Sequence, residues 1–241
     1  MRTLAVVAVA ILGFPSIGLA APCVPGSLST YISLGGGGCS IGLATVNDFS
    51  IDLLNPLASP IAADDITVTP FEILGSGFRL DFGVDQDAAA GEFFDALVGY
   101  SVSAPGILRA RLAMAGAAAS PDGVVTAVED LCLGAVFLSD PTTCAGIPAG
   151  PLIVFEAGFD QELAAELLFA PTSFFDVSVE IAIDAGPGGS ASLDGVASTE
   201  FTRVAVAEPS SLLLLGSALL GAARRYRRAT GRRRVPSRTD S

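Results

Sequence analysis

The sequence contains no histidine, no lysine and no tryptophan among its 241 residues. Without histidine, Ser-His-Asp and Cys-His nucleophilic catalysis are excluded, because no imidazole is available to act as the base, and no lysine can replace it. Without tryptophan, the commonest platform for stacking on sugars is missing, and Tyr31 and Tyr100 are weak substitutes for it. We therefore expect a protein that is not an enzyme, and we predict no catalytic residues.

Two further patterns of enzymes and nucleotide-binding proteins are also missing. Pairs of carboxylates occur, as in any acidic domain, but none lies in a context that is typical of glycoside hydrolases. The glycine run at 35–38 precedes Cys39 instead of the Lys-Ser/Thr pair of a phosphate-binding loop. The run is better explained as a flexible turn.

Positive charge is scarce outside the C-terminal segment. Between residues 22 and 207, four arginines stand against 23 acidic residues, a formal charge of −19. Such a segment repels phosphates, so we exclude nucleic acid as a partner. We interpret the acidity as the solvated surface of an exported protein. Calcium binding is the alternative, because this hard cation binds clustered carboxylates.

The best candidate for calcium is the segment 81–87, where Asp85 and Asp87 offer two carboxylates close together, with Glu92 and Asp95 further along. The glycine and the final glutamate of an EF-hand are not at the required positions. Asp64-Asp65 is a second acidic pair, which we expect in a loop. The prediction is no metal and no cofactor, with calcium at Asp85 and Asp87 as the alternative.

Residues 1–21 have the pattern of a secretory signal peptide. Arg2 precedes an apolar run at 4–12, and the small residues at 16–21 predict cleavage after Ala20 or Ala21. Pro22 stands where lipidation of Cys23 would need a small residue, so a lipoprotein is not expected. The segment 22–203 is therefore predicted to be exported into a compartment that permits disulfides.

The chain has four cysteines, which allow three disulfide connectivities. Their spacing favours local pairs, each closing a loop of about fifteen residues worth about 3 kcal/mol. These pairs are Cys23 with Cys39 and Cys132 with Cys144. A metal site is disfavoured because the chain has neither histidine nor a Cys-x-x-Cys motif.

The segment 204–228 has the pattern of a membrane anchor. Residues 204–223 are about as many as a helix needs to cross roughly 30 Å of hydrocarbon, and 212–223 are purely apolar. Glu208-Pro209 suits the entry of that helix. The positive-inside rule places the arginines after it in the cytoplasm and the preceding chain outside. A buried C-terminal helix of a globular domain is the alternative. The arginines are Arg224, Arg225, Arg227 and Arg228.

This order of parts resembles the PEP-CTERM sorting tail of Gram-negative bacteria, with Ala207-Glu208-Pro209 at its Pro-Glu-Pro-like tripeptide. Ala207 occupies the position of the first proline. The resemblance implies transient insertion in the inner membrane, N-terminus out and C-terminus in, and processing by an exosortase. Delivery to the cell surface or the extracellular space would follow. Residues 229–241 resemble a basic disordered appendix.

Short runs of strand-forming residues, separated by glycine, proline and aspartate, predict a mainly β ectodomain at 22–203. Alternation is clearest at 176–184, where Val177, Val179, Ile181 and Ile183 share one face. The run 159–169 is the exception and predicts a short helix, with Leu163 and Leu167 four residues apart. Many strands and few helices favour a two-layer antiparallel β-sandwich. The predicted strands are 46–53, 66–74, 78–82, 96–103, 108–114, 124–137, 152–155, 175–183, 191–193 and 198–206.

The pattern at 23–42, from Cys23-x-Pro-Gly to Cys39-x-Ile-Gly, also resembles the start of a group of secreted PEP-CTERM proteins, but it names no biochemical activity. Our main hypothesis is a non-enzymatic envelope or matrix protein, associated with extracellular polysaccharide or biofilm. The alternatives are a calcium- or carbohydrate-binding adhesin-like module and a permanently anchored single-span protein.

Overall fold

The structure is a computed structural model that describes residues 20–138 and 143–203. The predicted signal peptide lies outside these ranges except for its last two residues. The predicted membrane helix, the sorting tail and the basic appendix lie entirely outside them. Within the described ranges, no helix has the length and apolar character that crossing a membrane would require.

The described chain is mainly antiparallel β structure, as predicted. Twelve strands belong to one hydrogen-bonded sheet, in which β4 and β7 form the parallel pair. One short helix, α1 (Leu28–Ser33), and one 3-10 turn, η1 (Gly35–Gly37), precede most of the strands. The strands are β1 (Gly26–Ser27), β2 (Cys39–Ile41), β3 (Ala44–Asp52), β4 (Ser59–Pro60), β5 (Ile66–Ile73), β6 (Gly77–Ala88), β7 (Phe93–Ala119), β8 (Val124–Leu133), β9 (Ile147–Ala157), β10 (Asp160–Glu162), β11 (Ala164–Asp184) and β12 (Ala191–Arg203).

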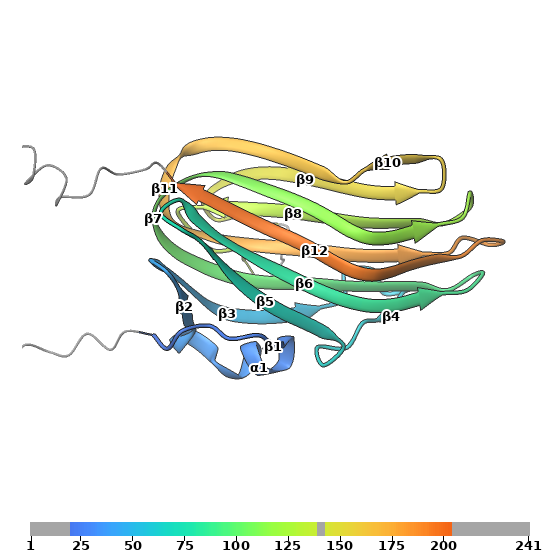
Figure 1. Cartoon of the computed structure of the whole chain (residues 1–241), viewed down its shortest axis with the longest axis horizontal. Helices are drawn as coiled ribbons and strands as arrows, with labels where there is room; N and C mark the ends of the chain where they lie inside the picture. The colour runs from blue at the N-terminus through green and yellow to red at the C-terminus, as the bar shows by residue number, and fades with distance from the viewer. Residues whose placement is uncertain (1–19, 139–142, 204–241) are drawn as a thin grey trace, which may run out of the picture. The chain divides into compact units, whose positions relative to one another are not determined.

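Two long strands, β7 and β11, divide the sheet into two arms (Figure 1). The first half of β7 pairs with β3 and its second half pairs with β12, and the change falls at Pro105-Gly106. In β11 the register shifts between Leu168 and Thr172. The β8 arm contains β3, the first half of β7, the second half of β11, β8, β9 and β10. The β6 arm contains β5, β6, β12 and the other halves of β7 and β11.

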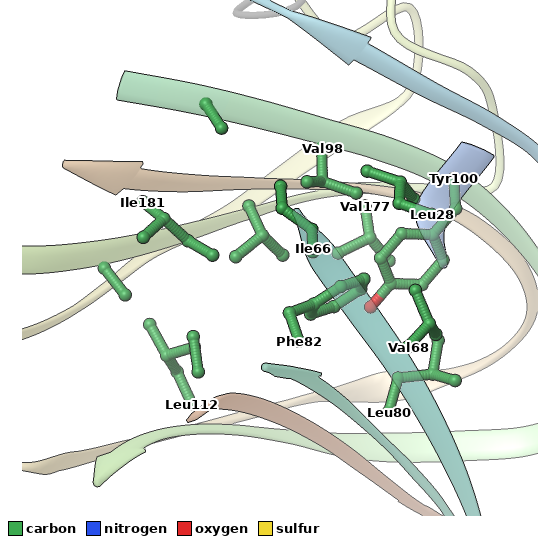
Figure 2. Packing of buried hydrophobic residues seen from close by; sticks show 14 of the residues in the cluster. Leu28, Ile66, Val68, Leu80, Phe82, Val98, Tyr100, Leu112, Val177 and Ile181 are labelled. Atoms are coloured by element: carbon green, nitrogen blue, oxygen red, sulfur yellow. The ribbon is translucent and has the colours of Figure 1, made fainter. Parts of the chain in front are cut away.

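Inward-facing side chains of the two arms meet in one hydrophobic core. The rings of Phe175 on β11 and Phe201 on β12 have centroids 5.0 Å apart. The Tyr100 hydroxyl on β7 is 2.7 Å from Thr199 Oγ1 on β12, and both side chains are buried. The predicted inward face of 176–184 is also buried. Figure 2 shows side chains of β5 and β6 directed toward those of β7 and β11, among them Ile66, Val68, Phe82, Val98, Tyr100, Val177 and Ile181.

Helix α1, which the sequence did not predict, closes one side of this core between β3 and β5 (Figure 1). Ser27 caps it, because its hydroxyl accepts the backbone N–H of Thr30. Leu28 is fully buried, and the Tyr31 ring meets Phe49 edge-on, with centroids 5.0 Å apart. The helix therefore supplies apolar side chains where neither arm of the sheet reaches.

The predicted helix at 159–169 is wrong, because these residues form β10 and the start of β11. Two leucines four residues apart also lie on one face of a strand, and here Leu167 packs against the core while Glu166 and Leu168 are exposed. Residues 164–168 pair with β7, and this pairing satisfies their backbone hydrogen-bonding groups in a strand rather than in a helix.

Several predicted strand ends also differ. The strands predicted at 96–103 and 108–114 form the single strand β7, and those at 191–193 and 198–206 form β12, which is described to Arg203. Strand β8 ends at Leu133 rather than at Phe137.

Both favoured disulfides are present. Cys23–Cys39 ties the N-terminal segment to β2, with 4.9 Å between the Cα atoms. Cys132–Cys144 ties the end of β8 to the segment before β9, with 5.2 Å between the Cα atoms.

Candidate functional site

The outer face of the β8 arm carries carboxylates on three of its strands, and we call it the acidic face. Its register brings together residues that are far apart in the sequence, because Ser101 and Leu97 on β7 lie opposite Asp176 and Glu180 on β11. On the other side of β11, Asp130 of β8 lies opposite Ser178. The acidic face contains Asp48 and Asp52 of β3, Asp130 of β8, and Asp176 and Glu180 of β11. Asp95 of β7 lies on the same side of the sheet but is fully buried, and its Oδ2 accepts the backbone N–H groups of Leu54 and Asn55.

A hollow of about 340 Å³ lies on this face. Its floor comes from β3, β7 and β11, and the segment after β8, Val136, Phe137 and Leu138, forms one wall. Asp176 is held in place there: the Ser101 hydroxyl donates to its Oδ1 at 2.5 Å, and the Phe137 backbone N–H donates to its Oδ2 at 3.0 Å. The hollow is therefore a shaped depression in which a carboxylate of the floor is held by hydrogen bonds from the floor and from the wall.

Burial raises the pKa values of three carboxyls on the acidic face, those of Asp130, Asp176 and Glu180. For Asp176, the hydrogen bonds from Ser101 and Phe137 lower the pKa, and the charge of Asp48 raises it. For Glu180, the charges of Asp95 and Asp130 add to the effect of burial. These groups thus repel one another across the strands.

The arginines of the described ranges lie elsewhere. Arg79, Arg109 and Arg111 are on the outer face of the β6 arm, where Arg79 Nη2 donates to Asp81 Oδ2 at 3.1 Å. Arg109 Nη2 is 3.0 Å from Glu200 Oε1, and Arg111 also faces Glu200. Three of the four described arginines therefore lie on the outer face of the β6 arm, and the fourth, Arg203 at the end of β12, lines a separate pocket with Glu72.

The structure does not gather the calcium candidates into one site, although Asp65 and Asp85 line one pocket together with Asp194. Asp85 and Asp87 are both exposed on strand β6 rather than in a loop, and Asp85 lies opposite Asp194 of β12. Glu92 accepts the backbone N–H of Ala89, whereas Asp95 is buried and accepts the backbone N–H groups of Leu54 and Asn55. Among residues 20–138 and 143–203, no group of three or more acidic or cysteine side chains is arranged to hold a metal ion.

The second acidic pair lies in a turn before β5, as predicted. Asp64 there accepts a hydrogen bond from the Ser29 hydroxyl at the start of α1. This carboxylate therefore anchors the helix, which gives it a structural role.

Sequence reasoning missed Glu129, which lies in the core. The side chain is fully buried on β8, and neither of its carboxyl oxygens has a hydrogen-bond partner. Burial, and then the charge of Asp130, raises its pKa to about 8, so the group is neutral at pH 7. Strand alternation could have revealed it, because Glu129 occupies an inward position between Ala127 and Leu131.

The family model of the PEP-CTERM protein-sorting motif matches residues 205–228. The chain carries a PEP-CTERM sorting motif. The match includes Ala207, Glu208 and Pro209, which we placed at the tripeptide, together with the arginines at 224, 225, 227 and 228. We base the proposed function on this PEP-CTERM motif.

No curated protein matches the chain. Among solved structures, the enzymatically active domain of bacteriophage CBA120 tailspike protein 4 is similar at 11% identity, with a TM-score of 0.21. The match covers 69% of this chain and 21% of that chain. A likeness at this level supports no statement about fold or activity.

Proposed function

We propose that the chain is an exported, non-enzymatic protein of the cell envelope or extracellular matrix, sorted and processed through its PEP-CTERM motif. The observation that carries the proposal is the family match at 205–228. An exosortase-type enzyme is the processing partner that this motif implies. The order of the apolar segment and the arginines supports an intermediate in the inner membrane with the ectodomain outside.

Features of the ectodomain support export. Cys23–Cys39 and Cys132–Cys144 are stable in an oxidising compartment. We infer that the two arms of the mainly antiparallel sheet pack on each other as a β-sandwich, with one hydrophobic core between them. At the cell surface or in the extracellular space, the protein associates with extracellular polysaccharide or biofilm.

Mass spectrometry of the full-length protein in its own cells tests the proposal. In cells with an exosortase, the surface-released protein should lack part of the tail, and in cells without the enzyme it should keep the whole tail. The variant Glu208→Ala/Pro209→Ala should keep the tail in both strains, because it removes the two residues of the tripeptide that match the Pro-Glu-Pro pattern of the sorting motif. Ser210→Ala/Ser211→Ala is the matched control and should be processed normally.

A full-length tail in both strains would contradict the proposal. If that full-length form stayed in the membrane fraction, the chain would instead be a permanently anchored single-span protein.

A further inference from the structure

We propose that the hollow on the acidic face binds arginine or lysine side chains of a basic partner polypeptide. The inference rests on the ectodomain alone and holds whether or not the tail is processed.

Charge is the first argument. Asp48 and Asp52 are exposed at the hollow, and Asp176 lies in its floor. Arg79, Arg109 and Arg111 are on the outer face of the β6 arm and are already paired with Asp81, Glu166 and Glu200, while Arg203 lines a separate pocket together with Glu72. Burial without a neighbouring cation raises the pKa of Asp176. A cation from a partner would therefore supply the countercharge that the ectodomain itself does not place here.

Shape is the second argument. The floor is lined by Gly99, which has no side chain, and by the small side chains of Ser50 and Ser178, so that the depression is not filled. At the rim, Val136 and Leu138 are apolar and remain 46% and 52% exposed. An arginine or lysine side chain matches this combination, because its apolar stem covers the rim while its charged head reaches the carboxylates.

The spacing of the carboxylates favours an organic cation over a metal ion. Asp52 and Asp176 stand on β3 and β11, with β7 between them, so their strands are about 10 Å apart. Calcium needs its oxygen ligands within about 2.6 Å. A guanidinium or an ammonium on a flexible stem can instead contact one carboxylate at a time, and neighbouring basic residues can occupy several of them.

The test uses the purified, disulfide-bonded protein and a fluorescent hexa-arginine peptide, with binding followed by anisotropy at near-physiological salt. We expect saturable binding, and none of the hexa-citrulline peptide, which has a similar shape without the charge. In Asp48→Asn/Asp52→Asn we expect the dissociation constant to rise about tenfold, because two partly exposed ion pairs are lost. Asparagine tolerates the positive φ of 54° at position 48, and both side chains are exposed, so the fold is kept.

Asp160→Asn/Glu162→Gln is the matched control. It removes the same charge from exposed residues of β10, and it should bind the peptide like the unchanged protein. Ser50→Phe keeps every carboxylate but fills the hollow, and it should weaken binding to a similar extent as Asp48→Asn/Asp52→Asn.

The proposal would be overturned if Asp48→Asn/Asp52→Asn and Asp160→Asn/Glu162→Gln weakened peptide binding equally, because net charge alone would then explain the attraction. It would also be overturned if Ser50→Phe bound the peptide as well as the unchanged protein. Binding of hexa-citrulline as strong as that of hexa-arginine would also overturn it. The same holds if calcium chloride binds to the unchanged protein but not to Asp48→Asn/Asp52→Asn, because the hollow would then be a metal site.

Discussion

At the scale of single residues, the unusual group is Glu129. An ionised carboxylate without partners is costly in a protein interior, and the protein avoids that cost by keeping this side chain protonated. Its neighbours offer little compensation, since the Tyr100 hydroxyl is already hydrogen-bonded to Thr199. Burial raises the pKa of Tyr100 as well, and the charge of Glu129 adds to this effect. Glu129 therefore makes the stability of the ectodomain depend on pH.

We expect the unfolding free energy to fall as pH rises from about 5 to 8. The unfolded chain releases the Glu129 proton near the ordinary pKa of 4.5, whereas the folded chain holds it up to about 8. Between these two pH values, the titration of Glu129 lowers the unfolding free energy by on the order of 1.4 kcal/mol per pH unit. Glu129→Gln should flatten this slope in urea unfolding, and Glu162→Gln, at an exposed position, should not. Equal slopes in Glu129→Gln and the unchanged protein would refute the prediction.

At the scale of elements, the bend in β7 determines the architecture. Gly106 lies between the half of β7 that pairs with β3 and the half that pairs with β12, and its φ is 67°. A side chain in this left-handed region is strained. The bend allows one continuous strand to serve both arms of the sheet.

Gly106→Ala should lower the unfolding free energy by about 1 kcal/mol through this backbone strain alone. A Cβ atom at Gly106 would meet no atom within 4 Å, so steric overlap does not contribute. Gly37→Ala is the matched control, because it also meets no atom within 4 Å and lacks a positive φ. Urea unfolding of both variants checks this, and equal stabilities would argue against strain at the bend.

At the scale of the whole molecule, two disulfides support a domain built from one sheet. They enclose short loops, with sequence separations of 16 and 12 residues. Their main effect is to restrict the unfolded chain, while the strands around them keep their own hydrogen bonds. The disulfides thus add stability to a topology that the sheet already defines.

Replacing Cys132 and Cys144 together with alanine should cost about 3 kcal/mol of unfolding free energy. The far-ultraviolet circular dichroism spectrum should stay that of a β protein, because β8 remains paired with β9 and β11. Urea unfolding of the oxidised protein and of the double variant measures the difference. A variant as stable as the unchanged protein would contradict the expected effect on the unfolded chain.

In the run 176–184 the apolar residues follow a single periodicity, and there the local pattern predicted the strand correctly. Val177, Val179, Ile181 and Ile183 alternate along the chain, and all four face the core. The run 159–169 was mistaken for a helix because its apolar spacing fits both periods, and only pairing with β7 separates them. Two strands were predicted where β7 is one, because Pro105-Gly106 interrupts the pattern although the strand continues through the bend.

The sequence by itself indicated the sorting motif, the disulfide pairing and the mainly β class of the fold. The sorting motif at 205–228, the disulfide pairs and the mainly β character all depend on residues that are close together in the chain. The tertiary structure alone decided which carboxylates share a face and that a hollow lies among them. The physical reason is register: hydrogen bonding between distant strands brings Asp52, Asp130 and Asp176 onto one surface, and local periodicity carries no information about such pairings.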